Sequence, residues 1–307
     1  MKELLRSFRR KLGGAILGPD LRRLLARIDT ALVVGEQKTA ERDRQMEFVL
    51  RRLSAQLELS RAERDDIEAL STKLVALRGT PEYQRAMDED EPLISVRIAS
   101  YRRTEELMDV AIASVRAQSY QNFEVIVVND GPNAKTRHAL KALGDARIRY
   151  EEFDQRSAYP GDGHARWMVA GSPGMNRGAD LARGNWIAPL DEDDCFTPDH
   201  IEKLLALAQS ERVELAYGAL IQKNRINGET HRIWSYPPKV SQFSFQGAIY
   251  LSLLNSIFRY DEASWLVEEP GDWNLIRRMS TAGVTMRATE DIVAVMNQIP
   301  YTHKAED

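Results

Sequence analysis

The chain has 307 residues, of which 43% are hydrophobic and 29% charged, and its formal net charge is −4 at pH 7. This length accommodates one large domain plus an appendage, and the composition is that of a folded globular protein. The overall charge gives no reason to expect a nucleic-acid partner. No apolar stretch reaches the ~18 residues of a membrane span, and the charged N-terminus does not resemble a signal peptide. The one cysteine, Cys195, excludes an internal disulfide, so we expect a cytoplasmic protein.

Residues 1–91 are rich in Arg, Glu, Leu and Ala, have few aromatic residues, and predict a helical appendage. In residues 1–17, leucine and phenylalanine recur at helical spacing between lysines and arginines. This pattern fits a basic amphipathic helix on the inner face of an anionic membrane, and it equally fits a helix packed on the protein itself.

Further apolar stripes follow within residues 21–32, 46–57 and 67–77. The heptad spacing fails at Ser60 and Arg64, so we expect a helical hairpin or an interrupted zipper rather than one continuous coiled coil. Self-association of the chain through these helices is a further hypothesis. Breaker residues at 79–81 and an acidic run just before Pro92 predict a domain boundary between residues 91 and 92.

From residue 92 to 307 the pattern changes to alternating strands and helices, which predicts an α/β domain with a mostly parallel sheet. The expected strands are 93–99, 123–128, 147–153 and 186–190, and the expected helices are 104–118, 134–143, 174–182 and 198–210. Ligands of open parallel sheets bind at the carboxyl ends of the strands. Three polar motifs of this chain follow such ends or begin a later helix.

The first motif is the acidic cluster Asp191-Glu192-Asp193-Asp194, directly after an apolar strand. Several carboxylates crowded at a strand tip repel one another unless a cation is present. Their oxygen atoms suit Mg²⁺ or Mn²⁺, which can bridge a nucleotide diphosphate. The alternative is a solvated acidic turn.

The second motif lies at the ends of the first two expected strands. Ala99-Ser100-Tyr101 offers backbone groups, a hydroxyl group and an aromatic face, and Asn129-Asp130-Gly131 adds an amide, a carboxylate and a flexible turn. Together they could stack and hydrogen-bond a nucleoside base. The alternative for residues 129–131 is a simple turn.

The third motif places Asp272 after a turn at 268–271 and at the start of an expected helix. A carboxylate there can point into a cleft as a general base, or it can cap the helix.

The chain from Pro92 to about residue 303 resembles the family 2 glycosyltransferases of the GT-A nucleotide-sugar-binding fold. Three stretches carry the resemblance: PLISVRIASYRRTEELMDVAIASVRAQSYQNFEVIVVNDGP, GMNRGADLARGNWIAPLDEDDCFTPDHIEKLL and EEPGDWNLIRRM. The resemblance implies an inverting, metal-dependent transferase that moves a sugar from a nucleotide sugar to a hydroxyl acceptor. The donor nucleotide is usually UDP, and the acceptor is a saccharide, a lipid-linked group or a protein. Polysaccharide or glycoconjugate assembly is the expected process.

The resemblance also assigns roles to individual positions. Ala99, Ser100, Tyr101 and Asp130 would hold the nucleoside, Asp191 the ribose, Asp193 and Asp194 the metal, and Asp272 would be the catalytic base. Ala99 stands where proline is common in the family, and Asn129 where an aspartate is common. The second departure leaves the identity of the donor nucleotide open.

Three further residues have weaker support. By position Glu269 would bind acceptor, and His303 would be a late metal ligand or part of a surface terminus. Arg177 would face the diphosphate or solvent.

Two other classes of function remain as alternatives. Carboxylates at a strand tip also serve metal-dependent phosphohydrolases and nucleotidyltransferases. The expected sequence signals of those enzymes are absent, because Cys195 occupies a position where a dehalogenase-like phosphatase has Thr or Val, and Ser100-Tyr101-Arg102-Arg103 is not a glycine-rich loop. In the other alternative, the helical region is an assembly or membrane-tethering module that carries an inactive transferase fold.

Overall fold

The structure is a computed structural model, and it describes residues 40–298. The chain divides into two compact units, Met1–Glu63 and Arg64–Asp307. The boundary that the sequence predicts, between residues 91 and 92, stays a prediction. Residues 1–17, for which we considered a membrane-surface helix, lie outside the described residues, as does His303.

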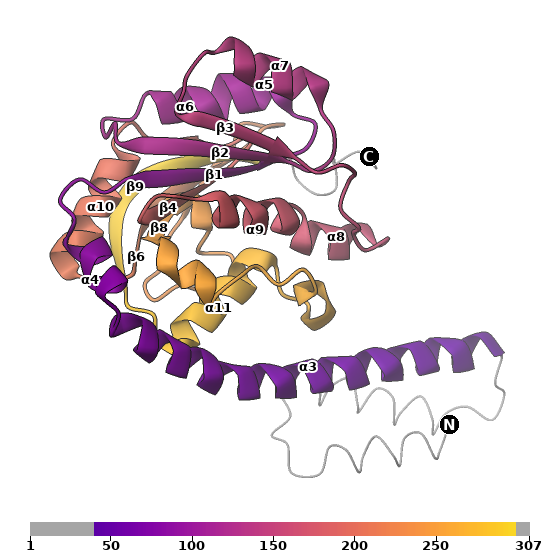
Figure 1. Ribbon diagram of the computed structural model, residues 1–307. Coiled ribbons are helices and arrows are strands. Elements are labelled where there is room, and N and C mark those ends of the chain that lie inside the picture. The colour runs from indigo at the N-terminus through magenta and orange to yellow at the C-terminus, as the bar shows by residue number, and fades with distance from the viewer. Residues whose placement is uncertain (1–39, 299–307) are drawn as a thin grey trace. The chain divides into compact units, whose positions relative to one another are not determined.

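Helix α3 (Ala40–Arg78) is continuous over 39 residues (Figure 1). It passes without a break through Ser60 and Arg64, because helix continuity needs only the absence of breakers, and residues 40–78 contain neither glycine nor proline. The expected helical hairpin or interrupted zipper stays a prediction, since the earlier apolar stripe at residues 21–32 lies outside the described residues. No helix within residues 40–298 is long and apolar enough to cross a membrane.

The sheet has nine strands, in the order β3-β2-β1-β4-β8-β6-β9-β5, with β7 paired to β6. The first four, β3, β2, β1 and β4, are parallel, and β6 is parallel to β9. The other neighbouring pairs are antiparallel. The strands are β1 (Ile94–Ser100), β2 (Phe123–Asn129), β3 (Ile148–Glu152), β4 (Trp186–Asp191), β5 (Cys195–Phe196), β6 (Leu215–Asn224), β7 (Thr230–Ile233), β8 (Ala248–Leu251) and β9 (Met286–Gln298).

The predicted α/β class is confirmed, and each strand and helix expected between residues 93 and 210 is present. The sequence did not predict α8. The helices after α3 are α4 (Pro81–Asp88), α5 (Thr104–Glu106) and α6 (Ala113–Arg116) joined by the π-helical turn η1 (Leu107–Ile112), α7 (Ala134–Ala142), α8 (Gly163–Val169), α9 (Ser172–Leu181), α10 (His200–Glu211) and α11 (Gly271–Ala282). Short 3₁₀ turns are η2 (Phe245–Gly247), η3 (Ser252–Ser256) and η4 (Ser264–Val267).

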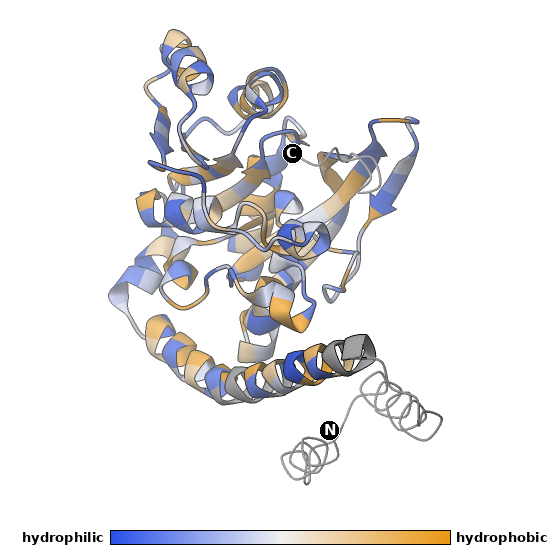
Figure 2. Ribbon diagram, turned by 90° about the vertical axis from the view of Figure 1, so that its right-hand side faces the viewer, coloured by the Kyte–Doolittle hydropathy of each residue, from blue (hydrophilic) through white to orange (hydrophobic). Residues whose placement is uncertain are grey.

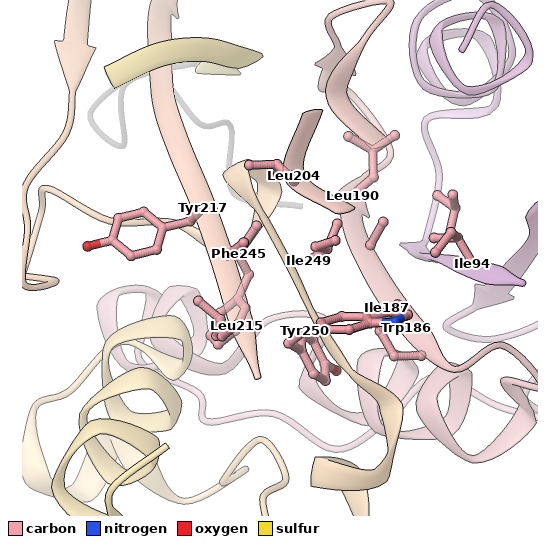
Figure 3. Packing of buried hydrophobic residues seen from close by; sticks show 14 of the residues in the cluster. Ile94, Trp186, Ile187, Leu190, Leu204, Leu215, Tyr217, Phe245, Ile249 and Tyr250 are labelled. Atoms are coloured by element: carbon pink, nitrogen blue, oxygen red, sulfur yellow. The ribbon is translucent and has the colours of Figure 1, made fainter. Parts of the chain in front are cut away.

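The core lies along the sheet, where β-branched and aromatic side chains fill the space between strands and helices. Trp186, Tyr217 and Tyr250 are among its largest fully buried side chains (Figure 3). Phe245 is also buried and belongs to the same hydrophobic cluster. Along the helices, hydrophobic residues are interspersed with hydrophilic ones (Figure 2), as expected where one helix face is buried.

A buried carboxylate joins the helices before residue 91 to the sheet. Glu214 is 0% exposed and accepts hydrogen bonds from Arg78 Nε at 2.7 Å, Tyr83 OH at 2.9 Å and Thr285 N at 2.8 Å. Leu70 and Leu74 pack in the same hydrophobic cluster as the strands. The core of the sheet unit therefore includes residues before 91.

Candidate functional site

A cavity of about 560 Å³ lies where the end of β4 meets the start of α11. Its polar side is formed by the acidic loop after β4, and its other walls come from α8, from residues 240–246 and from the first turn of α11. The residues that line it include Arg103, Trp167, Asp191, Asp193, Asp194, Ser244, Gln246, Tyr260, Asp272, Trp273 and Asn297. The cavity thus joins two of the three motifs that the sequence indicated.

Glu192, the second acid of the loop, has a structural role. Its Oε2 accepts hydrogen bonds from Ser100 Oγ at 2.7 Å and from Tyr101 N at 3.0 Å, so the acidic loop is tied to the end of β1. Burial raises the pKa of Glu192, and these two hydrogen bonds oppose the rise. Glu192 does not line the cavity.

The three aspartates of the loop point to the cavity from fixed positions. Gln246 Nε2 donates to Asp191 Oδ2 at 2.5 Å, Asn297 N donates to Asp194 Oδ1 at 2.7 Å, and Arg103 forms an ion pair with Asp193. Burial, together with the charges of Asp272 and Asp193, raises the pKa of Asp191 to about 7. Burial and the neighbouring aspartates also raise the pKa of Asp194 well above its ordinary value.

These carboxylates fit a divalent cation that is shared with a ligand. Within residues 40–298 no group of three or more acids, histidines or cysteines forms a ready cation site. Mg²⁺, however, is commonly bound by one or two carboxylates together with substrate phosphates and water. Burial is the main reason that the pKa values of Asp191 and Asp194 are raised, and repulsion between the neighbouring carboxylates adds to the rise. Asp193 and Asp194 can therefore hold Mn²⁺ or Mg²⁺ jointly with a diphosphate.

Asp272 lies in the first turn of α11 and is held from outside that helix. Its Oδ2 accepts hydrogen bonds from Ser244 Oγ at 2.9 Å and Phe245 N at 3.2 Å, and its Oδ1 accepts one from Tyr260 OH at 2.9 Å. The helix-cap position belongs to Pro270, which makes no side-chain cap. Asp272 is therefore not the N-cap of α11, as the alternative proposed.

The nucleoside motif is brought together, but it lies outside the cavity. Ser100 and Asn129 are paired in neighbouring parallel strands. The buried carboxylate of Asp130 accepts hydrogen bonds from Ser157 N at 2.8 Å and Tyr159 OH at 2.7 Å. Each of its oxygens thus accepts one hydrogen bond from within the protein. The Tyr101 ring is likewise covered, because the Arg156 guanidinium carbon is 4.1 Å from its centroid. Ala99 lies next to Gly171, which caps the N-terminus of α9, and to Gly174 in the first turn of that helix.

Two candidates from the sequence are engaged elsewhere. Glu269 accepts hydrogen bonds from Arg277 Nε and Nη2 at 2.8 and 2.7 Å and from Asn274 Nδ2 at 2.8 Å. Arg177 Nε donates to Glu151 at 2.5 Å. Neither Glu269 nor Arg177 lines the cavity, and their roles stay predictions.

Sequence reasoning did not identify Arg103, Gln246 or Tyr260, which bind the carboxylates of the site. Gln246 and Tyr260 come from a region without a recognised motif. The nearest signal was for Arg103, which follows the Ala99-Ser100-Tyr101 motif by two positions.

The family model described as "Glycosyl transferase family 2" matches residues 95–163 and 164–276. Among curated proteins, the putative glycosyltransferase EpsH of Bacillus subtilis is 32% identical over 40% of this chain and 32% of its own length. WfgD of Escherichia coli, a UDP-Glc:alpha-D-GlcNAc-diphosphoundecaprenol beta-1,3-glucosyltransferase, is 26% identical over 46% of this chain and 51% of its own length. The matched part of the chain thus spans about a third to a half of these relatives.

Solved structures support the same fold. The S. aureus TarS fragment 1–349 in complex with UDP-GlcNAc gives a TM-score of 0.51 at 14% identity, over 70% of this chain and 61% of that one. Another crystal structure of TarS 1–349 gives a TM-score of 0.50 at 15% identity, over 66% of this chain and 60% of that one. At this identity the likeness establishes the fold, which agrees with the expected GT-A architecture.

Proposed function

The chain belongs to glycosyl transferase family 2, and from this premise we propose that it transfers a sugar from a UDP-sugar to a hydroxyl group of an acceptor. The name of the Escherichia coli relative supports a UDP-linked donor and a role in glycan assembly. Family membership also favours a transferase over the phosphohydrolase and nucleotidyltransferase alternatives.

One observation carries the proposal: Asp272 and the three loop aspartates, about 80 positions apart in the sequence, line the same cavity. One carboxylate is then available to accept a proton, while the others face the place for a diphosphate. An inverting transfer needs this division of roles, because the acceptor attacks from the side opposite the leaving group.

In the proposed reaction, Asp272 accepts the proton of the acceptor hydroxyl as that oxygen bonds to the anomeric carbon. The bond from the anomeric carbon to the diphosphate oxygen breaks, and the configuration inverts. Ser244, Phe245 N and Tyr260 fix the orientation of the Asp272 carboxylate before the acceptor arrives. Bound through Asp193 and Asp194, Mn²⁺ or Mg²⁺ would neutralise charge on the departing diphosphate.

The test is nucleotide release from UDP-, GDP- and dTDP-sugars, measured with Mn²⁺ and with a chelator. We expect release from a UDP-sugar that stops when the cation is removed. Asp272→Asn should lower turnover by roughly 10³-fold or more while UDP binding persists, because only the proton acceptor is lost. Asp193→Ala should abolish the response to Mn²⁺.

The exposed Asp154 provides the matched control, since Asp154→Asn makes the same chemical change away from the cavity. It should leave turnover unchanged. If no donor gave cation-dependent release in the presence of a range of saccharide acceptors, the proposed function would be refuted.

A further inference from the structure

Arg97 is a charged residue in the middle of the central parallel strand β1. It is only 2% exposed, and its neighbours Val96 and Ile98 are fully buried. Arg97 Nη1 donates to the Met175 carbonyl oxygen at 3.0 Å. Within residues 40–298 no carboxylate forms an ion pair with Arg97, and its Nε has no hydrogen-bond partner. Burying an unpaired charge is costly, so the position of Arg97 requires a physical reason.

The chain makes space for this side chain. A Cβ atom at Gly178 would lie 2.6 Å from Arg97 Cγ and 3.1 Å from its Cδ. Only glycine at this position of α9 leaves room for the stem of Arg97. The absence of a side chain at Gly178 therefore accommodates the buried Arg97 side chain.

Arg97 lies behind the proposed base. Its guanidinium carbon is 5.2 Å from the centroid of the Tyr260 ring, and Tyr260 OH donates to Asp272 Oδ1 at 2.9 Å. Burial, and then the charge of Asp272, raise the pKa of Tyr260 well above its ordinary value. The phenol therefore stays protonated and remains a donor to Asp272.

The charges on the two sides of Asp272 differ in sign. On the cavity side lie the carboxylates of Asp191, Asp193 and Asp194, which line the same cavity as Asp272. On the other side, beyond the Tyr260 ring, lies the unpaired cation of Arg97. In a poorly solvated site such a cation offsets the repulsion between carboxylates more strongly than it would in water.

We propose that Arg97 is a positioning residue for the transfer reaction, which acts through Tyr260 to hold the Asp272 carboxylate in the orientation that accepts the acceptor proton. The inference rests on the proposed function of Asp272. Arg97 contacts Tyr260, and Tyr260 in turn contacts Asp272. Arg97 itself therefore touches neither donor nor acceptor in the proposed reaction.

The experiment compares Arg97→Met, Arg97→Lys, Tyr260→Phe and the Arg97→Met/Tyr260→Phe double variant. The readouts are kcat, the KM for the UDP-sugar, UDP affinity by calorimetry and the thermal midpoint. We expect Arg97→Met to lower kcat by roughly 10- to 100-fold with the donor KM changed less than about threefold, because proton transfer is impaired and donor binding is not. Arg97→Lys should recover part of kcat.

The double variant tests the path of the effect. If Arg97 acts through Tyr260, the double variant should be no slower than about the slower single variant, since coupled residues are not additive. The matched control is Arg149→Met on β3. Arg149 donates hydrogen bonds to Glu124 and to the Leu181 carbonyl oxygen, and neither Asp272 nor Tyr260 is among these partners, so this control should leave kcat unchanged.

Multiplicative losses in the double variant, an equal loss of kcat in Arg149→Met, or an unchanged kcat in folded Arg97→Met would each overturn the inference. If Arg97→Met does not fold, Tyr260→Phe and Arg97→Lys test the inference instead. An unchanged kcat in both of these variants would overturn the inference. No turnover by the wild-type protein would refute the proposed function and this inference with it. Wild-type turnover with an unaffected Arg97→Met would refute the inference alone.

Discussion

Asp272 and Glu269 are three residues apart at the start of one helix, yet their carboxylates are fixed by opposite means. Glu269 is held in a bidentate pair by the Arg277 cation, whereas the three groups that bind Asp272 are neutral. A carboxylate already engaged by a guanidinium is a poor proton acceptor, while neutral donors orient a carboxylate without neutralising it. At the scale of single residues, this contrast supports Asp272 over Glu269 as the base.

The buried imidazole of His200 leads to a prediction about pH. His200 is the first residue of α10, and its ring stacks on the Phe196 ring with 3.7 Å between the two ring centroids. Its Nδ1 forms a hydrogen bond with the Val293 carbonyl oxygen at 2.9 Å. Burial lowers the pKa of His200 from 6.5 to about 4. The unfolded chain therefore protonates His200 at a higher pH than the folded protein does. The contribution of neutral His200 to the free energy of unfolding is complete above pH 6.5 and is lost as the pH falls toward 4.

We expect the free energy of unfolding to lose about 2 kcal/mol through His200 between pH 6.5 and 5. Urea unfolding at both pH values, in wild type and His200→Gln, measures this contribution as the difference in pH dependence. His231→Gln, at an exposed histidine of β7, is the control and should keep the wild-type pH dependence. An equal pH dependence in wild type and His200→Gln would contradict the assignment.

The residues of the site were predictable only in part. Asp191, Asp193, Asp194 and Asp272 could be found because each follows a strand or begins a helix in a recognisable pattern. Gln246 and Tyr260 could not, because they reach Asp191 and Asp272 through contacts that only the fold creates. The covering of Asp130 by Ser157 and Tyr159 is of the same kind.

At the scale of elements, α8 is a helix that local sequence signals did not reveal. The run Pro160–Gly163 reads as a turn, and the seven-residue helix that follows is too short for apolar periodicity. The available signal was Asp162, whose Oδ1 accepts a hydrogen bond from Ala165 N at 2.8 Å as a helix cap. The consequence is functional, since α8 places Trp167, 41% exposed, on the wall of the cavity.

The turn into β4 depends on a glycine and leads to a prediction about packing. A Cβ atom at Gly184 would lie 2.5 Å from the Leu93 carbonyl oxygen and 2.7 Å from Ser95 N. Both are backbone atoms of the β1 region and cannot move without disturbing the sheet. Gly184→Ala should therefore lower the free energy of unfolding by roughly 1–3 kcal/mol.

Gly161 is the matched control, because its Cβ position is in open space and its φ is not in the left-handed region. Gly161→Ala should change the free energy of unfolding by less than about 1 kcal/mol in chemical denaturation. Equal effects of the two substitutions would mean that the close approach at Gly184 does not limit stability.

At the scale of the whole molecule, the parallel half of the sheet was predicted and the rest was not. Strands β1 to β4 alternate with helices along the chain, so local patterns indicate both their existence and their parallel direction. In the second half, β6 lies between β8 and β9 and is antiparallel to one and parallel to the other. Such long-range pairing leaves no mark in local periodicity.

The first residue of the folded unit can be tested, because fragments that start at Arg64 and at residue 92 retain different parts of the core. A chain starting at Arg64 keeps Leu70, Leu74 and Tyr83 in the core and Arg78 on Glu214. A chain starting at residue 92 loses them and leaves a fully buried carboxylate without Arg78 or Tyr83. Breaking a buried ion pair by removing one partner costs roughly 3–5 kcal/mol, to which lost core packing adds.

Residues 64–307 should therefore unfold cooperatively with a thermal midpoint within about 5 °C of the full chain, whereas residues 92–307 should unfold at much lower temperature or fail to fold. Calorimetry and near-UV circular dichroism on both fragments measure this. Arg78→Met in the full chain separates the two causes, since it removes the ion pair and leaves the apolar core in place. If residues 92–307 were as stable as residues 64–307, the result would support a domain boundary between residues 91 and 92. It would contradict the conclusion that α4 and the end of α3 stabilise the sheet unit.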